Sequence, residues 1–271
     1  MSLQSAAYGP ARPIGAATPA VRHIALHDLG EVLRQGWRDF QAAPTHLVFL
    51  CLIYPVVGLL LGRIASGENA IPLLYPLLAG FALIGPFAAV GIYDLSRQRE
   101  QGETISWRNA FDVLRSPRIA PILLLGAMLA ALFVVWLLVA QRIFDALMQP
   151  ESARTIPALL TAAFTTHAGW SLVLIGTAVG FVFAVVAITL TIVSFPLLVD
   201  REVGPTIGDQ AAVAVATSVR AVAANPVVIA VWGIIVAVGL ALGMVTLFVG
   251  LAVVMPVLGH ATWHLYRKLV A

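Results

Sequence analysis

Charged side chains are scarce in this chain of 271 residues, where Asp, Glu, Lys and Arg together make up only 11%. Soluble domains carry about 25%, and hydrophobic residues here reach 60%. A water-soluble protein of this size has too large a surface to cover with so few charges. The scarcity excludes an ordinary soluble domain and predicts that much of the surface faces lipid.

Cysteine and the common catalytic motifs are also scarce or missing. The single cysteine, Cys51, lies within an apolar run, which excludes an intrachain disulfide. The sequence has no phosphate-binding loop, dinucleotide fingerprint, nucleophile elbow or paired-histidine zinc motif. No ionisable residue stands in the middle of an apolar run, where ion-coupled carriers usually have one. We therefore expect no catalytic residue, no cofactor and no nucleic-acid partner.

Six apolar stretches are long enough to cross a bilayer core about 30 Å thick as helices. In chain order they are approximately Thr45–Gly62, Ile71–Tyr93, Ile119–Gln141, Ala168–Val199, Val227–Gly243 and Val245–His264. They predict an all-α membrane protein with six transmembrane helices in a single domain, residues 22–271. Residues 1–21 are rich in Ala, Gly and Pro and lack a secretory signal, which predicts a disordered cytoplasmic tail.

The basic residues predict the orientation of these six helices. Of the 16 Lys and Arg residues, only Arg63, Arg142 and Arg154 fall on the side opposite the N-terminus. Loops on the cytoplasmic side of a membrane carry the excess of Lys and Arg. We therefore expect a multi-pass protein of the bacterial cytoplasmic (inner) membrane with both termini in the cytoplasm.

One pattern occurs three times, in modules of about residues 22–105, 106–203 and 204–271. Each module has an amphipathic stretch ending at a proline, an apolar run, and a second apolar run with a proline near its end. The first prolines are Pro44, Pro117 and Pro226, and the second are Pro86, Pro196 and Pro256. Proline ends or kinks helices, so we expect structural roles for all six and pseudo-threefold packing of the modules. A cavity between the kinked helices and three bends in a solid bundle are both open.

Each module is expected to begin with an amphipathic helix. The first has capping-box spacing at Asp28 and Glu31, and the others follow the potential caps Ser106 and Thr206. Their apolar positions recur at three- and four-residue steps: Leu29, Val32, Leu33, Gly36, Trp37 and Phe40; Trp107, Ala110, Phe111 and Leu114; and Ile207, Ala211, Val215, Val219 and Val222. The pattern favours helices lying in the membrane interface, with packing beneath the transmembrane helices as the alternative.

Histidines near the cytoplasmic end of the transmembrane helices form the strongest polar cluster. His260 and His264 are four residues apart and share a helix face, while His46 begins the first crossing at the same level, near Tyr93 and Asp94. Neutral imidazoles can bind a metal or haem iron, but no Cys or Glu completes a ligand set. Histidines at an interface can also simply bond headgroups and loop carbonyls. We expect no metal here, with His260, His264 and His46 as the weak candidates.

Several segments resemble one known family. They are Gly36–Phe40 through Pro44, Tyr54–Gly58, Gly80–Phe87, Ser194–Leu198 and Pro256–Arg267. Over residues 22–270 the chain resembles an uncharacterised family of bacterial integral membrane proteins, catalogued as a domain of unknown function. Some members carry a cytochrome c oxidase subunit label. The catalytic subunit of an oxidase has many more crossings and histidine ligands in the membrane core, so this chain cannot be that subunit. An accessory or assembly role beside a respiratory complex and an unrelated role in the envelope are both open.

Three functions are open on this evidence. The favoured one is a scaffold, accessory or assembly protein in the lipid bilayer, near a respiratory complex or elsewhere in the envelope, with a membrane-protein partner or a second copy of itself. The second is a carrier or channel for a neutral or lipidic molecule, which would need a polar cavity between the modules. The third is haem or metal binding at the cytoplasmic end.

Overall fold

The structure is a computed structural model that describes residues 19–43, 76, 85–87, 89–148, 155–246 and 249–271. Its elements are α1 (Leu26–Ala42), α4 (Val90–Glu100), the 3₁₀ helix η2 (Trp107–Arg115), α5 (Ile119–Leu147), α6 (Ile156–Thr165), α7 (His167–Thr191), α8 (Ser194–Asp200), α9 (Ile207–Ala224), α10 (Pro226–Val245) and α11 (Leu251–Leu269). Over these ranges there is no β-strand, and only one isolated bridge, between Val21 and Val270. The all-α prediction is confirmed for this part of the chain.

Three of the described helices are long and apolar enough to cross a membrane. They are α5, the consecutive pair α7–α8 (His167–Asp200) and α10, which correspond to the third, fourth and fifth predicted crossings. The first two predicted crossings fall mostly outside the described residues. The sixth overlaps α11, which carries two histidines and ends in Arg267 and Lys268 and is not among the three. Six crossings, and the threefold repeat, remain predictions.

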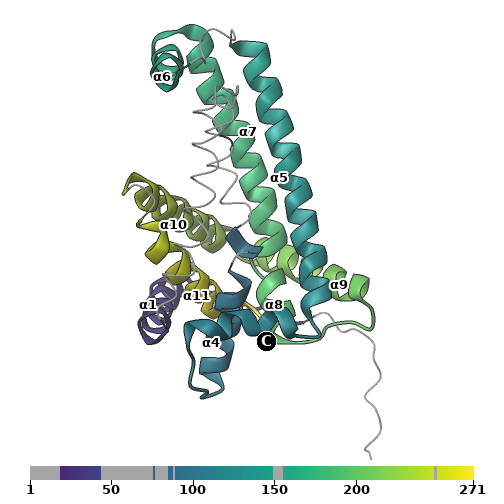
Figure 1. Cartoon of the computed structure of the whole chain (residues 1–271). Coiled ribbons are helices and arrows are strands. Elements are labelled where there is room, and N and C mark those ends of the chain that lie inside the picture. The colour runs from purple at the N-terminus through teal and green to yellow at the C-terminus, as the bar shows by residue number, and fades with distance from the viewer. Residues whose placement is uncertain (1–18, 44–75, 77–84, 88, 149–154, 247–248) are drawn as a thin grey trace, which may run out of the picture.

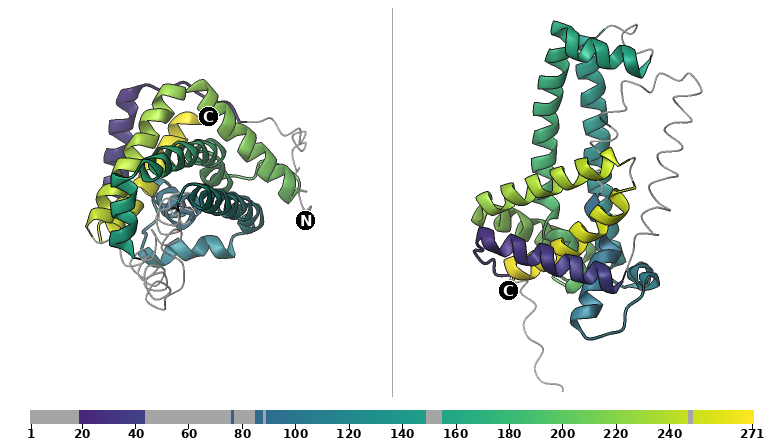
Figure 2. Two further views of the ribbon diagram at one scale, coloured as in Figure 1. Left: turned by 90° about the horizontal axis from the view of Figure 1, so that it is seen from above. Right: turned by 90° about the vertical axis from the view of Figure 1, so that its left-hand side faces the viewer.

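The helices gather at one end of the molecule and extend unequally from it. Helices α5 and α7 stand upright side by side with α6 at their far end, whereas α10 and α11 form an oblique hairpin (Figures 1 and 2). Helices α1, α4, α8 and α9 and the C-terminus lie at the other end, which we call the base. Above the base, large apolar side chains are exposed on α5 and α7, with Leu138, Leu174 and Phe181 each more than 60% exposed. Such a surface suits contact with lipid.

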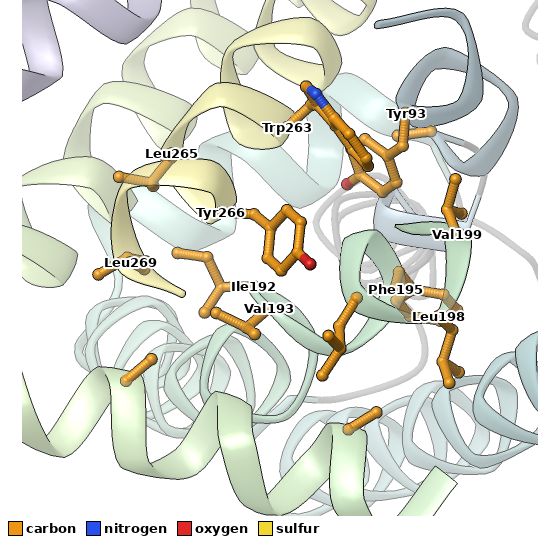
Figure 3. Close-up of a cluster of buried hydrophobic side chains, with 14 of the residues drawn as sticks. Tyr93, Ile192, Val193, Phe195, Leu198, Val199, Trp263, Leu265, Tyr266 and Leu269 are labelled. Atoms are coloured by element: carbon orange, nitrogen blue, oxygen red, sulfur yellow. The ribbon is translucent and has the colours of Figure 1, made fainter. Parts of the chain in front are cut away.

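A dense apolar core holds the base together (Figure 3). Every residue from Ser194 to Val199 in α8 is buried, because α4, α5, α9 and α11 surround this short helix. Phe195 of α8 and Trp263 and Tyr266 of α11 are completely buried. Burying a large apolar side chain contributes roughly 1.5–3 kcal/mol relative to exposing it to water. The base is therefore a well-packed unit rather than a set of loops between crossings.

The prolines of the second apolar runs behave differently from one another. Helix α7 ends at Thr191 and α8 begins at Ser194, just before Pro196. At this break the amide of Val193 donates to Ser218 Oγ at 3.2 Å instead of to its own helix. Pro256, by contrast, lies inside the uninterrupted helix α11, and Pro86 lies in a short helical segment ahead of α4. The helix is therefore interrupted just before Pro196 and continuous through Pro256.

Two of the three prolines that follow the leading helices stand at helix boundaries, as predicted. Pro226 takes the first position of α10 directly after α9 and Asn225. Pro117 lies in the short connection between η2 and α5. Pro44 falls outside the described residues. A proline needs no backbone donor at the first turn of a helix, which is why the chain can turn there at little cost.

Helix α1 packs against other helices of the protein. This was the alternative to the predicted position in the membrane interface. Leu29 and Val32 are buried against the core, and a Cβ added to Gly36 would lie 2.6 Å from the amide nitrogen of Ala261 in α11. The capping prediction is wrong by one turn: the helix begins at Leu26, and Asp28 Oδ2 accepts from the amide of Ala25 at 2.8 Å. Asp28 therefore sits inside the first turn and is not the cap itself.

Helix α9 begins as predicted but buries a different face. Thr206 Oγ1 accepts from the amide of Asp209 at 3.1 Å, which confirms the cap. The buried side chains are small ones, namely Ala211, Ala214, Thr217, Ser218 and Ala221. Ile207 and Val219 of the expected stripe are exposed instead. Small side chains occupy the buried face because they let α9 approach α5, α7 and α8 closely.

The two described ends of the chain are joined at the base. The amide of Arg22 donates to the carbonyl of Leu269 at 2.8 Å, and the amide of Ala271 donates to the carbonyl of Ala20. The buried side chain of Asn225 also binds this segment, accepting from the amide of Ile24 at 2.9 Å and donating to the carbonyl of Arg22 at 3.0 Å. The segment before α1 and the C-terminus thus lie on the same side of the molecule.

Candidate functional site

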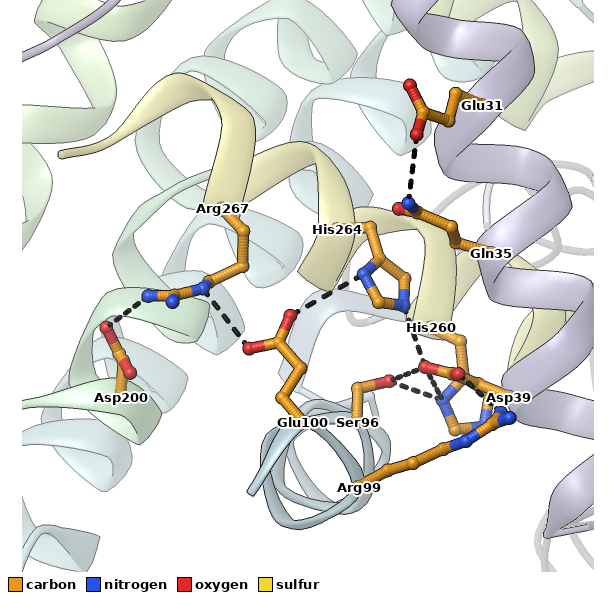
Figure 4. Close-up of polar contacts among 10 residues, drawn as sticks. All are labelled: Glu31, Gln35, Asp39, Ser96, Arg99, Glu100, Asp200, His260, His264 and Arg267. Carbon is orange, nitrogen blue, oxygen red and sulfur yellow. Dashed lines mark hydrogen bonds and ion pairs between the residues drawn. The ribbon is translucent and has the colours of Figure 1, made fainter. Parts of the chain in front are cut away.

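Three helices bring polar side chains together at the base (Figure 4). Helix α1 supplies Asp39, which lies on the same face as Val32 and Gly36. Helix α4 supplies Ser96, Arg99 and Glu100, and α11 supplies His260, His264 and Arg267. Residues three or four apart on a helix share a face, so each helix points its set toward the same point. We call these seven polar residues the carboxylate cluster, because Asp39 is at its centre.

Asp39 is buried and both of its carboxylate oxygens are hydrogen-bonded. Oδ1 accepts from the guanidinium of Arg99 at 2.6 Å. Oδ2 accepts from Ser96 Oγ at 2.8 Å and faces His264 Nε2 at 2.8 Å. A carboxylate only accepts hydrogen bonds, so the nitrogen of His264 must be the donor. One side chain of α1 therefore binds α4 twice and α11 once.

The hydrogen-bond pattern also defines the protonated nitrogen of His260. Its Nδ1 lies 2.7 Å from Ser96 Oγ, and the ring is completely buried. The one hydroxyl proton of Ser96 is donated to Asp39, so Ser96 can only accept from His260. Nδ1 of His260 therefore carries a proton. Its Nε2 has no hydrogen-bond partner in the part of the chain that the structure describes.

Contacts between polar and charged side chains continue outward from Asp39. His264 Nδ1 lies 3.7 Å from Glu100 Oε1, and Glu100 Oε2 lies 3.2 Å from Arg267 Nε. Arg267 in turn lies 3.5 Å from Asp200, whose Oδ2 also accepts from the hydroxyl of Tyr266 at 2.6 Å. On the other flank, Lys268 donates to Asp28 at 2.8 Å and to Glu31 at 2.9 Å. These contacts tie α11 to α1, α4 and α8.

A pocket of about 530 Å³, open to solvent, lies over the carboxylate cluster. Its charged lining residues are Arg38, Asp39, Arg99, Glu100, Arg267 and Lys268, with His264 beside them. Four cationic side chains thus surround two carboxylates. In this pocket a small polar molecule or a protruding side chain of another protein could be received by several charged groups at once.

The pKa of Asp39 is set by burial and hydrogen bonding, which act in opposite directions. Burial raises the pKa of this carboxyl, but hydrogen bonds from His264 and Ser96 outweigh burial and leave the pKa below its usual value. Asp39 is therefore an anion at neutral pH. The charge is stabilised locally by donors from two other helices, so the cluster holds the three helices in one arrangement.

The residue types of a Ser-His-Asp triad meet here, but in an unsuitable order. In such a triad the histidine stands between the other two, with one ring nitrogen for each. Here Ser96 and Asp39 both lie nearest the same nitrogen, Nδ1 of His260, at 2.7 and 3.9 Å. Ser96 is also completely buried and gives its proton to Asp39. The geometry does not activate Ser96 as a nucleophile.

Metal binding finds no support in the described ranges either. They contain no group of three or more His, Cys, Asp or Glu residues placed to hold a metal ion. The nitrogens of His260 and His264 that face Ser96 and Asp39 are occupied by hydrogen bonds. His46 lies outside the described residues, so the structure does not bring the three histidine candidates together.

The sequence located part of this site and missed its centre. His260 and His264 do share a face of α11, as their spacing indicated. Asp94, expected nearby, instead pairs with Arg97 at 2.7 Å within α4, and Tyr93 packs in the apolar core. Asp39 was missed, although it stands seven residues after Val32 on the apolar face of α1. An acidic residue on a buried face was the available signal.

Helices with apolar exposed surfaces, and a base that carries the charges, are typical of a protein embedded in a bilayer. Residues 74–200 match the family DUF2189, described as a predicted integral membrane protein. The DUF2189 segment ends at the last residue of α8 and includes Ser96, Arg99 and Glu100, but not Asp39 or the two histidines of the cluster. The match confirms the resemblance to a membrane-protein family of unknown function. No curated protein and no solved structure matches the chain.

Proposed function

We propose that this chain is a non-catalytic scaffold or accessory protein of the bacterial cytoplasmic membrane, which receives a membrane-protein partner at the pocket over the carboxylate cluster. The observation that carries the proposal is the use of the polar groups at the base. Asp39 is hydrogen-bonded to both Ser96 and His264, and these bonds hold α1, α4 and α11 together. A rigid base with a charged recess suits recognition of another protein better than turnover of a substrate.

The proposal places the base in the cytoplasm with both chain ends. Support comes from the pairing of the segment before α1 with the C-terminus and from the positions of the basic residues. Arg99, Arg118 and Arg267 lie in elements of the base, whereas Arg142 lies near the far end of α5. Cytoplasmic surfaces carry the basic excess. Reporter fusions at each terminus should report the cytoplasm, and a fusion after Met148 should report the opposite side.

Purification of the full chain in mild detergent tests the binding role. Arg38 is exposed and lines the pocket, whereas Arg34, one turn earlier on α1, is exposed and lies outside the lining. We expect a stoichiometric membrane-protein partner with the wild type and with Arg34→Glu, and its loss with Arg38→Glu. Recovery of a lone monomer would contradict the scaffold role. Equal partner recovery with both variants would exclude the pocket as the binding surface.

A further inference from the structure

Helix η2 differs from the other two leading helices in its geometry. A 3₁₀ helix has three residues per turn, so residues three apart lie directly above one another. Trp107, Ala110 and Val113 therefore form one face, and Ala110 and Val113 are buried. This face packs on α4 so closely that a Cβ added to Gly91 would clash with the carbonyl oxygen of Ala110. The stripe predicted for an α-helix is thus split between two faces.

The second face of η2 is apolar and uncovered. It consists of Arg108, Phe111 and Leu114, and we call it the outer face. Phe111 is 49% exposed and Leu114 is 61% exposed. The third face carries the polar side chains Asn109, Asp112 and Arg115. Two neighbouring large apolar side chains exposed on one face of so short a helix are a candidate surface for an apolar contact.

The short connection between η2 and α5 indicates the level of η2 relative to the membrane. Only three residues separate Arg115 from Ile119, the first residue of a helix that can cross the membrane. Leu123 and Leu124, in the second turn of α5, are already about half exposed. The start of α5 is attached to the base, because Arg118 donates to the carbonyls of Val199 and Asp200. The lipid-facing surface of α5 therefore begins next to η2.

We propose that the outer face of η2 inserts into the headgroup–acyl boundary of the leaflet beside the base, with a preference for anionic lipid. Continuity with the lipid-facing surface of α5 identifies the bilayer as the occupant. Charge agrees, since Arg108 and Arg115 flank the apolar pair and basic side chains at this level attract anionic headgroups. The Arg108 guanidinium lies 5.5 Å from the centre of the Trp107 ring, and such aromatic side chains favour the membrane interface.

This contact would connect the membrane to the pocket. Helix η2 holds α4 through Ala110 and Gly91, and α4 carries Ser96, Arg99 and Glu100 of the carboxylate cluster. With η2 in the interface, α4 would fix the position of the pocket, and of a partner bound there, relative to the membrane. The insertion of η2 itself does not depend on the existence of that partner.

Fluorescent labelling of single cysteines in the full chain tests the insertion. In a Cys51→Ser background, Phe111→Cys and Leu114→Cys place an environment-sensitive dye on the outer face. Asp112→Cys is the matched control on the polar face of the same helix, and Leu138→Cys on α5 is the control for deep lipid contact. The variants are reconstituted in phosphatidylcholine vesicles with and without phosphatidylglycerol, and brominated lipid is the quencher.

We expect blue-shifted emission and strong quenching at positions 111 and 114, close to the signal at 138, and a water-like signal at 112. Adding Arg108→Glu and Arg115→Glu should reduce the quenching in phosphatidylglycerol vesicles more than in phosphatidylcholine alone. Water-like emission at both 111 and 114 would overturn the proposal. So would a protected signal that disappears when the protein is diluted in excess lipid, because it would identify a second copy as the occupant.

Discussion

Asp39 Oδ2 lies 2.8 Å from His264 Nε2, joining α1 to α11 across 225 residues of sequence. The same oxygen accepts from Ser96 in α4, so three helices meet at one carboxylate atom. Leaving a buried group without its partner costs more than the intact interaction contributes. The consequences of disturbing Asp39 and its surroundings are therefore measurable on the full chain in detergent.

Replacing Asp39 with Asn should destabilise the base. The change removes the negative charge that Arg99 and His264 face. Breaking a fully buried ion pair costs roughly 3–5 kcal/mol, but the Arg99 side chain is 37% exposed, so we expect about 1–3 kcal/mol. Thermal unfolding in detergent should show the loss. Asp112→Asn, on the exposed polar face of η2, should change the unfolding temperature little, and an equal loss there would contradict the role of Asp39.

The contribution of Asp39 should also depend on pH. Its pKa is lowered in the folded state, so its stabilisation is complete above the unfolded pKa of about 3.9 and is lost as pH falls through the lower folded value. The difference in unfolding temperature between wild type and Asp39→Asn should be constant from neutral pH down to about pH 5 and then shrink with further acid. A difference that grows toward low pH would exclude this linkage.

Gly36 should tolerate no side chain, in contrast to Gly30 on the same helix. A Cβ at Gly36 would meet the amide nitrogen of Ala261 at 2.6 Å and the carbonyl oxygen of Val257 at 2.8 Å, both backbone atoms that cannot turn aside. Gly36→Ala should therefore cost about 1–3 kcal/mol by forcing α1 away from α11, despite the better helix propensity of alanine.

Gly30→Ala is the matched control for that change. A Cβ at Gly30 would meet nothing within 4 Å. The substitution should stabilise α1 by about 0.5–1 kcal/mol because alanine loses less conformational entropy in a helix. Thermal unfolding of both variants in the same detergent compares them directly. Opposite signs are expected, and two equal effects would show that α1 and α11 do not approach as closely as the structure has them.

Asn225→Ala should release the segment ahead of α1. The Asn225 side chain accepts from the amide of Ile24 and donates to the carbonyl of Arg22, so its loss leaves both backbone groups without these bonds. We expect faster tryptic cleavage at Arg22, with little change in global unfolding because the core contacts remain. Asn109→Ala, on the polar face of η2, should leave cleavage at Arg22 unchanged. Equal protection of Arg22 in both variants would contradict the attachment.

The class of protein and several element boundaries were predictable from the sequence. Apolar stretches of sufficient length identified α5, α7 and α10 because a lipid environment demands long uninterrupted apolar helices. Pro226 and the cap at Thr206 placed the limits of α9 correctly, since both act through local backbone geometry. The spacing of His260 and His264 showed that they share a face, which is a property of one helix alone.

The partners of these faces were not predictable in the same way. Asp39, Ser96 and His264 come from separate helices. The sequence of α1 alone does not predict that its acidic residue contacts a histidine 225 residues later. The faces of η2 and α9 were misjudged for a related reason. A 3₁₀ helix repeats every three residues rather than 3.6, and α9 buries alanines because close approach to its neighbours outweighs hydrophobicity.

The amino-acid sequence alone determined that this chain belongs in a membrane, that it is helical, and where its charges concentrate, because composition and periodicity act locally along the chain. Tertiary structure alone decided that α1 packs on α11, that Asp39 becomes the junction of three helices, and that η2 keeps an apolar face uncovered. Those outcomes depend on which surfaces meet, and steric fit and the satisfaction of buried charge select them only once the helices are assembled.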